Sequence, residues 1–366
     1  MPQTIPLRTS HIQANPPLKQ LWFTRCPVPT ATGLAYRLGW FQEEFAPDGI
    51  TVATIQDAPK ELRRHHYDHE LTSLIREGGS LLALPARAQG AKTRLIGLTW
   101  IDEWQAILVR PDSGISSPRD LKGLRVALPA YVENEIPAHV RGSSIARGMS
   151  LQGIKGALAH DGLTLDDVHF VEVGSGQGAR EGAGLGSLWA GLDNLARGEV
   201  DAVYVKGASA VEAAQRVGAI VGIDLDAFTD RRYRVNNGTP RPITVHEDLL
   251  YDHFDIVVRF LAQTLRAAEW AKTNLAAIHD ILQGETGSGE AGVATAYRND
   301  FHLSLHPSLS DELIELFHIQ KKFTLLHGIL DRDFDLESWI DHRPLEAARK
   351  LLEQREQQVQ PQQRAA

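Results

Sequence analysis

The sequence predicts an α/β protein with mostly parallel sheets and two domains, and three observations lead to this prediction. Short apolar, β-branched runs alternate with segments of helical periodicity from about residue 21 to residue 227, which is the pattern of strand–helix units. Beyond Leu249, helical patterns dominate. The length of 366 residues exceeds what one hydrophobic core usually serves.

The individual elements follow from periodicity and from turn residues. Apolar or β-branched runs bounded by turns predict strands at 21–25, 49–57, 93–100, 104–112, the end of 116–129, and 200–205. Apolar residues spaced by three and four predict helices at 30–45, 71–79, the start of 187–198, 249–282 and most of 310–357. The helix at 71–79 is expected to end at the pair Gly78-Gly79.

Composition argues against several classes of protein. The formal net charge of -8 is unlike the basic surface of a nucleic-acid-binding protein. No stretch approaches the 18 apolar residues of a membrane span. The first 20 residues lack the apolar run of a signal peptide, so we expect a cytoplasmic location.

The single cysteine, Cys26, lies in "CPVP" between the first predicted strand and the helix that begins at Thr30. Strand-to-helix turns of open α/β sheets face the ligand cleft. The positive end of that helix and the neighbouring Arg25 would both favour a thiolate. Two interpretations follow from the residues alone: a reactive thiol at a cleft, or a small buried hydrophobe.

Two other segments resemble ligand-binding motifs only superficially. "HHYDH" holds His65, His66 and His69, but it has no cysteine partner and no HExxH pattern, so we expect no metal. "GSGQGAR" (174–180) lacks the Gly-Lys-Ser/Thr end of a phosphate-binding loop, which favours a loop at the cleft edge. We expect no organic cofactor either.

Two later segments, "SSPRDLKGLRVALP" (116–129) and "LARGEVDAVYV" (195–205), lie about 80 residues apart. In this order they resemble blocks of the type II periplasmic binding-protein fold, most closely its branch for sulfonates, nitrate and thiamine precursors. The resemblance implies two α/β lobes with the ligand cleft between them. In such a fold the chain passes from one lobe to the other twice. We place these two crossings near Val109 and Asp230, so that 1–109 with 230–366 forms lobe I and 110–229 forms lobe II.

A second resemblance covers more of the chain, from about Leu21 to Pro344. It is carried by "CPVP", by a histidine ten residues before an arginine, by a Gly-Gly pair ending three residues after that arginine, and by "FTLLHGILDRDFDLESW" (323–339). Together these resemble the 2'-hydroxybiphenyl-2-sulfinate desulfinase family, which performs the last step of dibenzothiophene desulfurisation. Motif by motif, the resemblance implies an active site of Cys26, His66, Arg76 and Gly79, with Gly78 beside it.

The chemistry that the resemblance implies is C–S bond cleavage with release of sulfite and without a cofactor. Arg76 would offer a planar fork to two sulfinate oxygens, and the N–H of Gly79 would be a further donor. His66 would orient the thiol of Cys26 and tune its proton affinity. The thiol would either attack sulfur or protonate carbon, and the sequence leaves both roles open.

The segment "RGSSIARG" (141–148) lies where the second lobe of such folds presents hydroxyls and helix amides to an anion. We therefore expect Ser143 and Ser144 to bind substrate, with ordinary helix capping as the other interpretation. The desulfinase motif has a tryptophan where our alignment places Ser144, which predicts a substrate smaller or more polar than the biaryl. Candidates for an aromatic pocket wall, or else for the core, are Trp100, Trp104 and Trp189.

Three functions are therefore considered. The first is a desulfinase that hydrolyses the C–S bond of a small anionic, aromatic organosulfur substrate. The alternative is a non-catalytic protein that binds a sulfonate-like or heterocyclic anion for an ABC transporter or a sensor. The third is another cofactor-free enzyme on this fold, such as a decarboxylase or a pyrimidine-synthesis enzyme. The absence of a signal peptide and the thiol at the cleft favour the first.

Overall fold

A five-stranded sheet forms the centre of the first lobe of the computed structural model, which describes residues 17–131, 144–174 and 189–363. The strand order is β2-β1-β3-β10-β4. Its strands are β1 (Gln20–Phe23), β2 (Thr51–Thr54), β3 (Leu74–Glu77), β4 (Thr93–Thr99) and β10 (Arg241–His246). β1 runs parallel to β2 and β3, whereas β10 runs antiparallel to β3 and β4.

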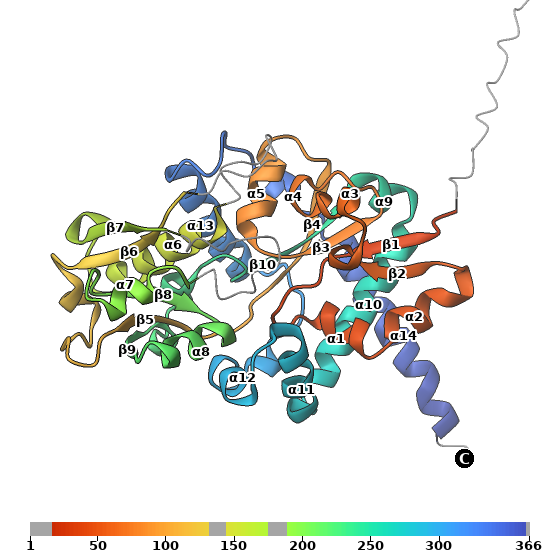
Figure 1. Ribbon diagram of the computed structural model, residues 1–366. Helices are drawn as coiled ribbons and strands as arrows, with labels where there is room; N and C mark the ends of the chain where they lie inside the picture. Colours follow the sequence, from red (N-terminus) through yellow and green to blue (C-terminus); the bar gives the residue numbers. More distant parts are fainter. Residues whose placement is uncertain (1–16, 132–143, 175–188, 364–366) are drawn as a thin grey trace, which may run out of the picture.

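Helices cover this sheet and extend to the C-terminus (Figure 1). They are α1 (Ala31–Arg37), α2 (Trp40–Phe45), α3 (Lys60–Arg63), α4 (His65–Asp68), α5 (Ser80–Ala88), α9 (Glu247–Asp252), α10 (Phe254–Ala271), α13 (Asp311–Leu326) and α14 (Arg343–Gln363). The long helix α10 packs against α1 and α14. Phe41 of α2 stacks on Phe260 of α10 with ring centroids 4.2 Å apart, which anchors the N-terminal helices to the C-terminal ones.

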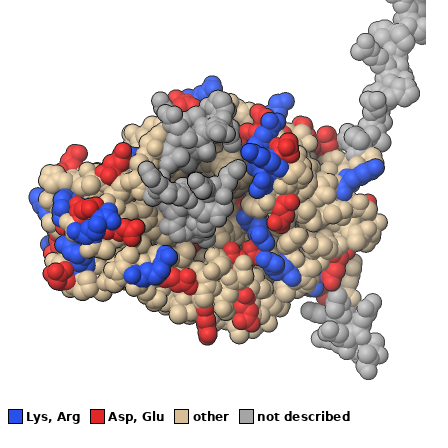
Figure 2. Space-filling model, viewed as in Figure 1, with Lys and Arg blue, Asp and Glu red and all other residues tan. Residues whose placement is uncertain are grey.

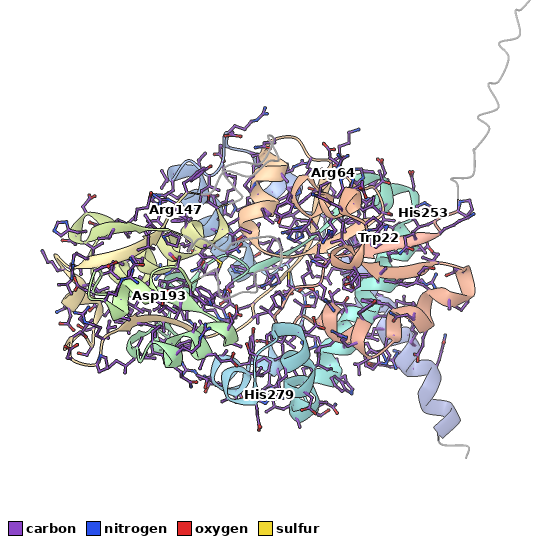
Figure 3. The ribbon with its side chains drawn as sticks, viewed as in Figure 1. Trp22, Arg64, Arg147, Asp193, His253 and His279 are labelled. Carbon is purple, nitrogen blue, oxygen red and sulfur yellow. The ribbon has the colours of Figure 1, made fainter. Side chains whose placement is uncertain are left out.

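The second lobe contains two smaller sheets, shown on the opposite side of Figure 1. One has the order β8-β5-β9 and the other pairs β6 with β7. The strands are β5 (Gln105–Val109), β6 (Arg125–Pro129), β7 (His169–Val173), β8 (Val203–Lys206) and β9 (Ile220–Asp224), and the helices are α6 (Ile145–His160), α7 (Leu192–Ala196) and α8 (Ala208–Arg216). Figure 3 marks Arg147 and Asp193 in this lobe and Trp22 in the first.

The later chain also reaches the second lobe. α11 (Leu275–Thr286) contacts α1, and α12 (Glu290–Ala296) packs on α8 and on α11. Gly292 of α12 lies so close to α8 that a Cβ there would meet the Ala208 carbonyl at 3.2 Å. This helix pair therefore joins the two lobes below the cleft.

The prediction of an α/β fold is confirmed, but the sheets are mixed and not mostly parallel. β1, β3 and β8 end at the space between the lobes, whereas β5 and β10 begin there. When the chain passes from one lobe to the other, the next strand enters its lobe from the cleft. It is therefore antiparallel to the strands that end at the cleft. This explains why β5 and β10 are the antiparallel members.

The predicted helix at 71–79 is wrong, because residues 74–77 form strand β3. All four side chains of β3 are buried between β1 and β10. A strand that is buried on both faces shows no alternation, and its leucine and isoleucine then match a helical spacing by chance. Gly78 and Gly79 accordingly lead into α5 and do not end a helix.

The boundaries of the lobes remain a proposal. β5 pairs with β8 and β9 of the second lobe, so we propose that the first crossing lies between Thr99 and Gln105, a few residues before the predicted position near Val109. We place the second crossing between β9 and β10, a segment that includes the predicted Asp230.

None of the helices that the structure describes is long and apolar enough to cross a membrane. On the described part of the face drawn in Figure 2, acidic and basic side chains are interspersed and form no broad basic surface. Ser143 and nearly all of the loop at 174–180 lie outside the described residues.

Candidate active site

A cavity of about 330 Å³ lies between the two lobes and is lined by both. Its polar and titratable side chains come from strands, from the loops beside them and from the short helix α4: Cys26, His66, Arg76, Glu103, Lys206 and Arg241. Apolar side chains form the remaining wall: Val28, Leu82, Ile145, Met149 and Trp189. Four residues predicted as the active site, Cys26, His66, Arg76 and Gly79, thus line one cavity.

Cys26 follows β1 and is partly buried. Its thiol donates a hydrogen bond to the backbone carbonyl of Glu77 at 3.4 Å, and the hydroxyl of Thr24 donates to the same carbonyl at 2.6 Å. Arg25, which we expected to favour the thiolate, forms an ion pair with Glu285 at 3.4 Å. Arg76 lines the same cavity as the thiol, and the two groups interact electrostatically.

Arg76 is almost completely buried, with 1% of its surface exposed. Its Nε donates to the His66 carbonyl at 3.4 Å and its Nη2 to the Gly79 carbonyl at 3.2 Å, while Nη1 is buried without a partner among the described residues. Burial lowers the pKa of Arg76 to about 10, although the charge of Cys26 opposes this shift. Arg76 is thus a cation at neutral pH with one nitrogen open, and not the free two-nitrogen fork that we expected.

The two glycines after Arg76 make room for neighbouring side chains. A Cβ at Gly78 would lie 2.8 Å from the Arg76 guanidinium, and one at Gly79 would lie 2.3 Å from the Asn237 Oδ1. That oxygen accepts a hydrogen bond from the backbone N–H of Leu81 at 3.0 Å. Any larger side chain at either position would disturb the wall of the cavity.

His66 belongs to the short helix α4. Its Nδ1 is buried and has no hydrogen-bond partner in the described part of the chain. Burial, and then the charge of Arg76, lower the pKa of His66 to about 3. The imidazole is therefore neutral at physiological pH, so it does not supply a positive charge to the thiol.

The neighbouring His65 contacts a carboxylate of its own short helix. His65 Nδ1 lies 2.7 Å from Asp68 Oδ1. Among the residues that the structure describes, no group of three or more His, Cys, Asp or Glu side chains could hold a metal ion.

Sequence reasoning missed three charged residues of the cavity: Glu103, Lys206 and Arg241. Lys206 Nζ forms an ion pair with Glu103 Oε2 at 3.3 Å, and Tyr297 donates its hydroxyl proton to Glu103 Oε1 at 2.8 Å. Burial lowers the pKa of Lys206. A signal was present in "VYVKG", where one charged residue ends an apolar strand and precedes a glycine.

Ser144 is the N-cap residue of α6 and is buried. From α6, the cavity receives Ile145 and Met149, so substrate contact by Ser144 stays a prediction. Trp189 belongs both to the core and to the cavity wall, the two interpretations that its sequence left open. It is 5% exposed and lines the cavity. Its Nε1 donates a hydrogen bond to Ser209 Oγ at 3.0 Å.

Comparison with known proteins supports the resemblance to desulfinases. The 2'-hydroxybiphenyl-2-sulfinate desulfinases of Rhodococcus erythropolis and Rhodococcus qingshengii are each 26% identical to this chain over 345 aligned residues, covering 87% of this chain and 90% of theirs.

Solved structures confirm the fold. The desulfurization enzyme DSZB superposes with a TM-score of 0.71 at 23% identity, covering 91% of this chain and 99% of its own. A cysteine-to-serine mutant of DSZB in complex with biphenyl-2-sulfinic acid gives 0.71 at 24% identity, covering 90% and 99%. The periplasmic aliphatic sulphonate binding protein SsuA from Escherichia coli gives 0.63 at 15% identity, covering 88% and 92%.

The fold is therefore that of the type II periplasmic binding proteins, with two α/β lobes and the cleft between them. The family described as NMT1/THI5 like matches residues 29–275, which is more than half of the chain. The chain belongs to the NMT1/THI5-like family.

Proposed function

We propose that this protein is a cofactor-free desulfinase that cleaves the C–S bond of an aromatic sulfinate and releases sulfite. One observation carries the proposal: a thiol, a buried guanidinium with an open N–H and an apolar wall line one cavity. The similarity to desulfinases over 87% of the chain supports it. The overall reaction adds water, so that R–SO₂⁻ and H₂O give R–H and HSO₃⁻.

The charges of the cavity suit the sulfinate end of such a substrate. Nη1 of Arg76 donates to a sulfinate oxygen, and in a buried site this charge-assisted bond is strong. Cys26 then faces the sulfur and the carbon attached to it. The C–S bond breaks, the carbon takes a proton and the sulfur takes the oxygen of water.

His66 acts as a neutral group in this scheme. With a pKa of about 3, it is not a general acid at neutral pH, but the neutral ring keeps one N–H donor and one acceptor nitrogen, so it can form hydrogen bonds with water or with the thiol. The attraction that stabilises negative charge on sulfur thus comes from Arg76. The role of His66 is to orient the water or the thiol to which it is hydrogen-bonded.

The apolar wall suits the aromatic part. Val28, Leu82, Met149 and Trp189 bring aliphatic and aromatic surface to the cavity. Its volume of about 330 Å³ is at the low end for small-molecule pockets. This supports the expectation of a substrate smaller than hydroxybiphenyl sulfinate.

The test is sulfite release from a panel of aryl and alkyl sulfinates. We expect release by the wild type, none by Cys26→Ser, and a large loss in Arg76→Gln. Arg231→Gln is the matched control, because Arg231 forms an ion pair with Glu312 at 3.1 Å outside the cavity.

A second candidate is a binding protein for an organosulfur anion, favoured by the fold similarity to SsuA. Tight binding of sulfonates or sulfinates without sulfite release from any of them would decide for that function and against the desulfinase.

A further inference from the structure

Arg241, the first residue of β10, is a buried cation that has no hydrogen-bond or ion-pair partner among the residues that the structure describes. It is 6% exposed and lines the cavity. Its Nε is buried and lacks a hydrogen-bond partner, and its side chain forms no hydrogen bond or ion pair with any residue that the structure describes. Arg76 and Lys206, the other two cations of the cavity wall, are both bonded to the protein.

The surroundings of Arg241 hold its guanidinium in place. Gly238 has a φ of +75°, and a Cβ on it would lie 2.7 Å from Arg241 Nη2. The loop that carries Gly238 is fixed by Lys206, whose Nζ donates to the Asn237 carbonyl at 3.3 Å and to Thr239 Oγ1 at 2.8 Å. Arg241 thus packs on a glycine, as Arg76 packs on Gly78.

The two arginines start from the same edge of the sheet. The N–H of Gly78 donates to the Pro242 carbonyl at 3.2 Å, and Ile243 pairs with Glu77. Arg241 therefore begins its strand beside Gly79, one strand away from Arg76. The wall of the cavity therefore carries two separate guanidinium groups, each of which can bind its own anionic group.

The balance of charge in the cavity favours a ligand with more than one negative charge. In the part of the chain that the structure describes, Lys206 forms an ion pair with a carboxylate, that of Glu103, whereas Arg76 and Arg241 form none. Burial raises the pKa of the Glu77 carboxyl, and the charge of Arg241 opposes this shift. Glu77 and Arg241 nevertheless form no ion pair in the described structure. A buried unpaired charge is costly, and an incoming anion removes that cost.

The open nitrogens differ between the two arginines. Arg76 has only Nη1 available, because Nε and Nη2 are bonded to carbonyls. The guanidinium of Arg241 forms no hydrogen bond with a described residue, its Nε being buried and unpartnered, and a planar guanidinium matches a carboxylate in bidentate geometry.

We propose that the substrate carries two anionic groups: a sulfinate at Arg76 and Cys26, and a carboxylate bound by Arg241. The sulfinate end rests on the proposed function, whereas the carboxylate site rests on Arg241 alone. The substrate class is an aromatic sulfinate with a carboxylate on the ring or on a short side chain.

The test measures binding without turnover, by calorimetry on the Cys26→Ser protein. The matched ligands are benzenesulfinate and its 2-carboxy and 3-carboxy derivatives. We expect the better carboxylated ligand to bind about 30-fold more tightly than benzenesulfinate, the gain typical of charge-assisted hydrogen bonds. Adding Arg241→Gln should reduce this gain to about 3-fold or less and leave benzenesulfinate almost unchanged, whereas adding Arg231→Gln should preserve it.

Three outcomes would overturn the proposal: no gain from either carboxylate, a gain that persists without Arg241, or an equal loss for all three ligands, which would place the sulfinate itself on Arg241. Arg241→Lys, which keeps the charge but not the fork, should retain part of the gain, and it serves if the glutamine variant does not fold. Failure of the desulfinase proposal is distinguishable, because it would show as absence of sulfite from the wild type while the difference in binding remains.

Discussion

Acidification should destabilise this protein through His66, and the size of the effect can be worked out. The pKa of His66 is about 3 in the folded protein, because of burial and of Arg76, and about 6.5 in an unfolded chain. Below pH 6.5 the unfolded state therefore binds a proton that the folded state does not, so the free energy of unfolding falls as the pH falls. Between pH 7 and pH 5 this loss amounts to about 2 kcal/mol, and it continues to grow toward pH 3.

The measurement is urea unfolding at pH 7, 6 and 5 for the wild type and for His66→Gln, which has no titrating group at this site. The variant should lose about 2 kcal/mol less than the wild type over this range. Burial also lowers the pKa of other histidines, namely His246, His306 and His327, but their contributions are the same in both proteins and cancel.

The matched control is His342→Gln, since His342 is an exposed histidine, and it should follow the wild type. If the wild type and His66→Gln lose stability in parallel, or if the His66 ring titrates near pH 6.5 by NMR, the neutral imidazole of our scheme is refuted.

Three further predictions concern the same cavity. Gly79→Ala should destabilise by about 1–3 kcal/mol in urea unfolding, because its Cβ displaces the Asn237 amide; an unchanged midpoint would contradict the packing described. Lys206→Met should cost about 3–5 kcal/mol by leaving Glu103 buried and unpaired, and adding Glu103→Gln should recover much of it; no recovery would show that the ion pair is not the cause. Cys26 should react with iodoacetamide faster than glutathione does near neutral pH, with loss of activity, and slow alkylation would argue against a reactive thiol.

The sequence was sufficient to predict those elements whose structure depends on residues close together in the chain. The first strand, the proline-bounded turn after it and the helix near Thr30 follow from local propensity, and the structure confirms them as β1 and α1. A cysteine at the end of a strand in an α/β chain is also a local feature. Its place in the cavity could therefore be expected, whereas the placement of Arg76 and Gly79 there came from the resemblance to the desulfinase family.

The sequence was insufficient where burial decides. β3 was predicted as part of a helix because Leu71, Leu74 and Ile75 match a helical spacing, and the strand shows no alternation between polar and apolar residues. Both charged side chains of β3, Arg76 and Glu77, are in fact buried. Only tertiary structure, which places β3 between two other strands, makes this possible.

The remaining cations of the cavity could not be assembled from sequence. Lys206 ends β8 and Arg241 begins β10, two strands of different sheets, and no spacing along the chain relates them to each other or to Arg76. The sequence "VYVKG" marks Lys206 as a charged residue at the end of an apolar strand, but it does not show which other residues Lys206 meets, and Arg241 follows a turn that many loops share. Their convergence depends on the two crossings between the lobes.

The central claim is that this cavity breaks a carbon–sulfur bond, and the most direct test follows both atoms in one reaction. Wild-type protein is incubated in D₂O with benzenesulfinate or its carboxylated derivatives, and sulfite and arene are quantified together. We expect equimolar sulfite and arene, one deuterium at the carbon that carried sulfur, and neither product with Cys26→Ser. Sulfinate recovered intact from the wild type, or equal product from Cys26→Ser, would contradict it.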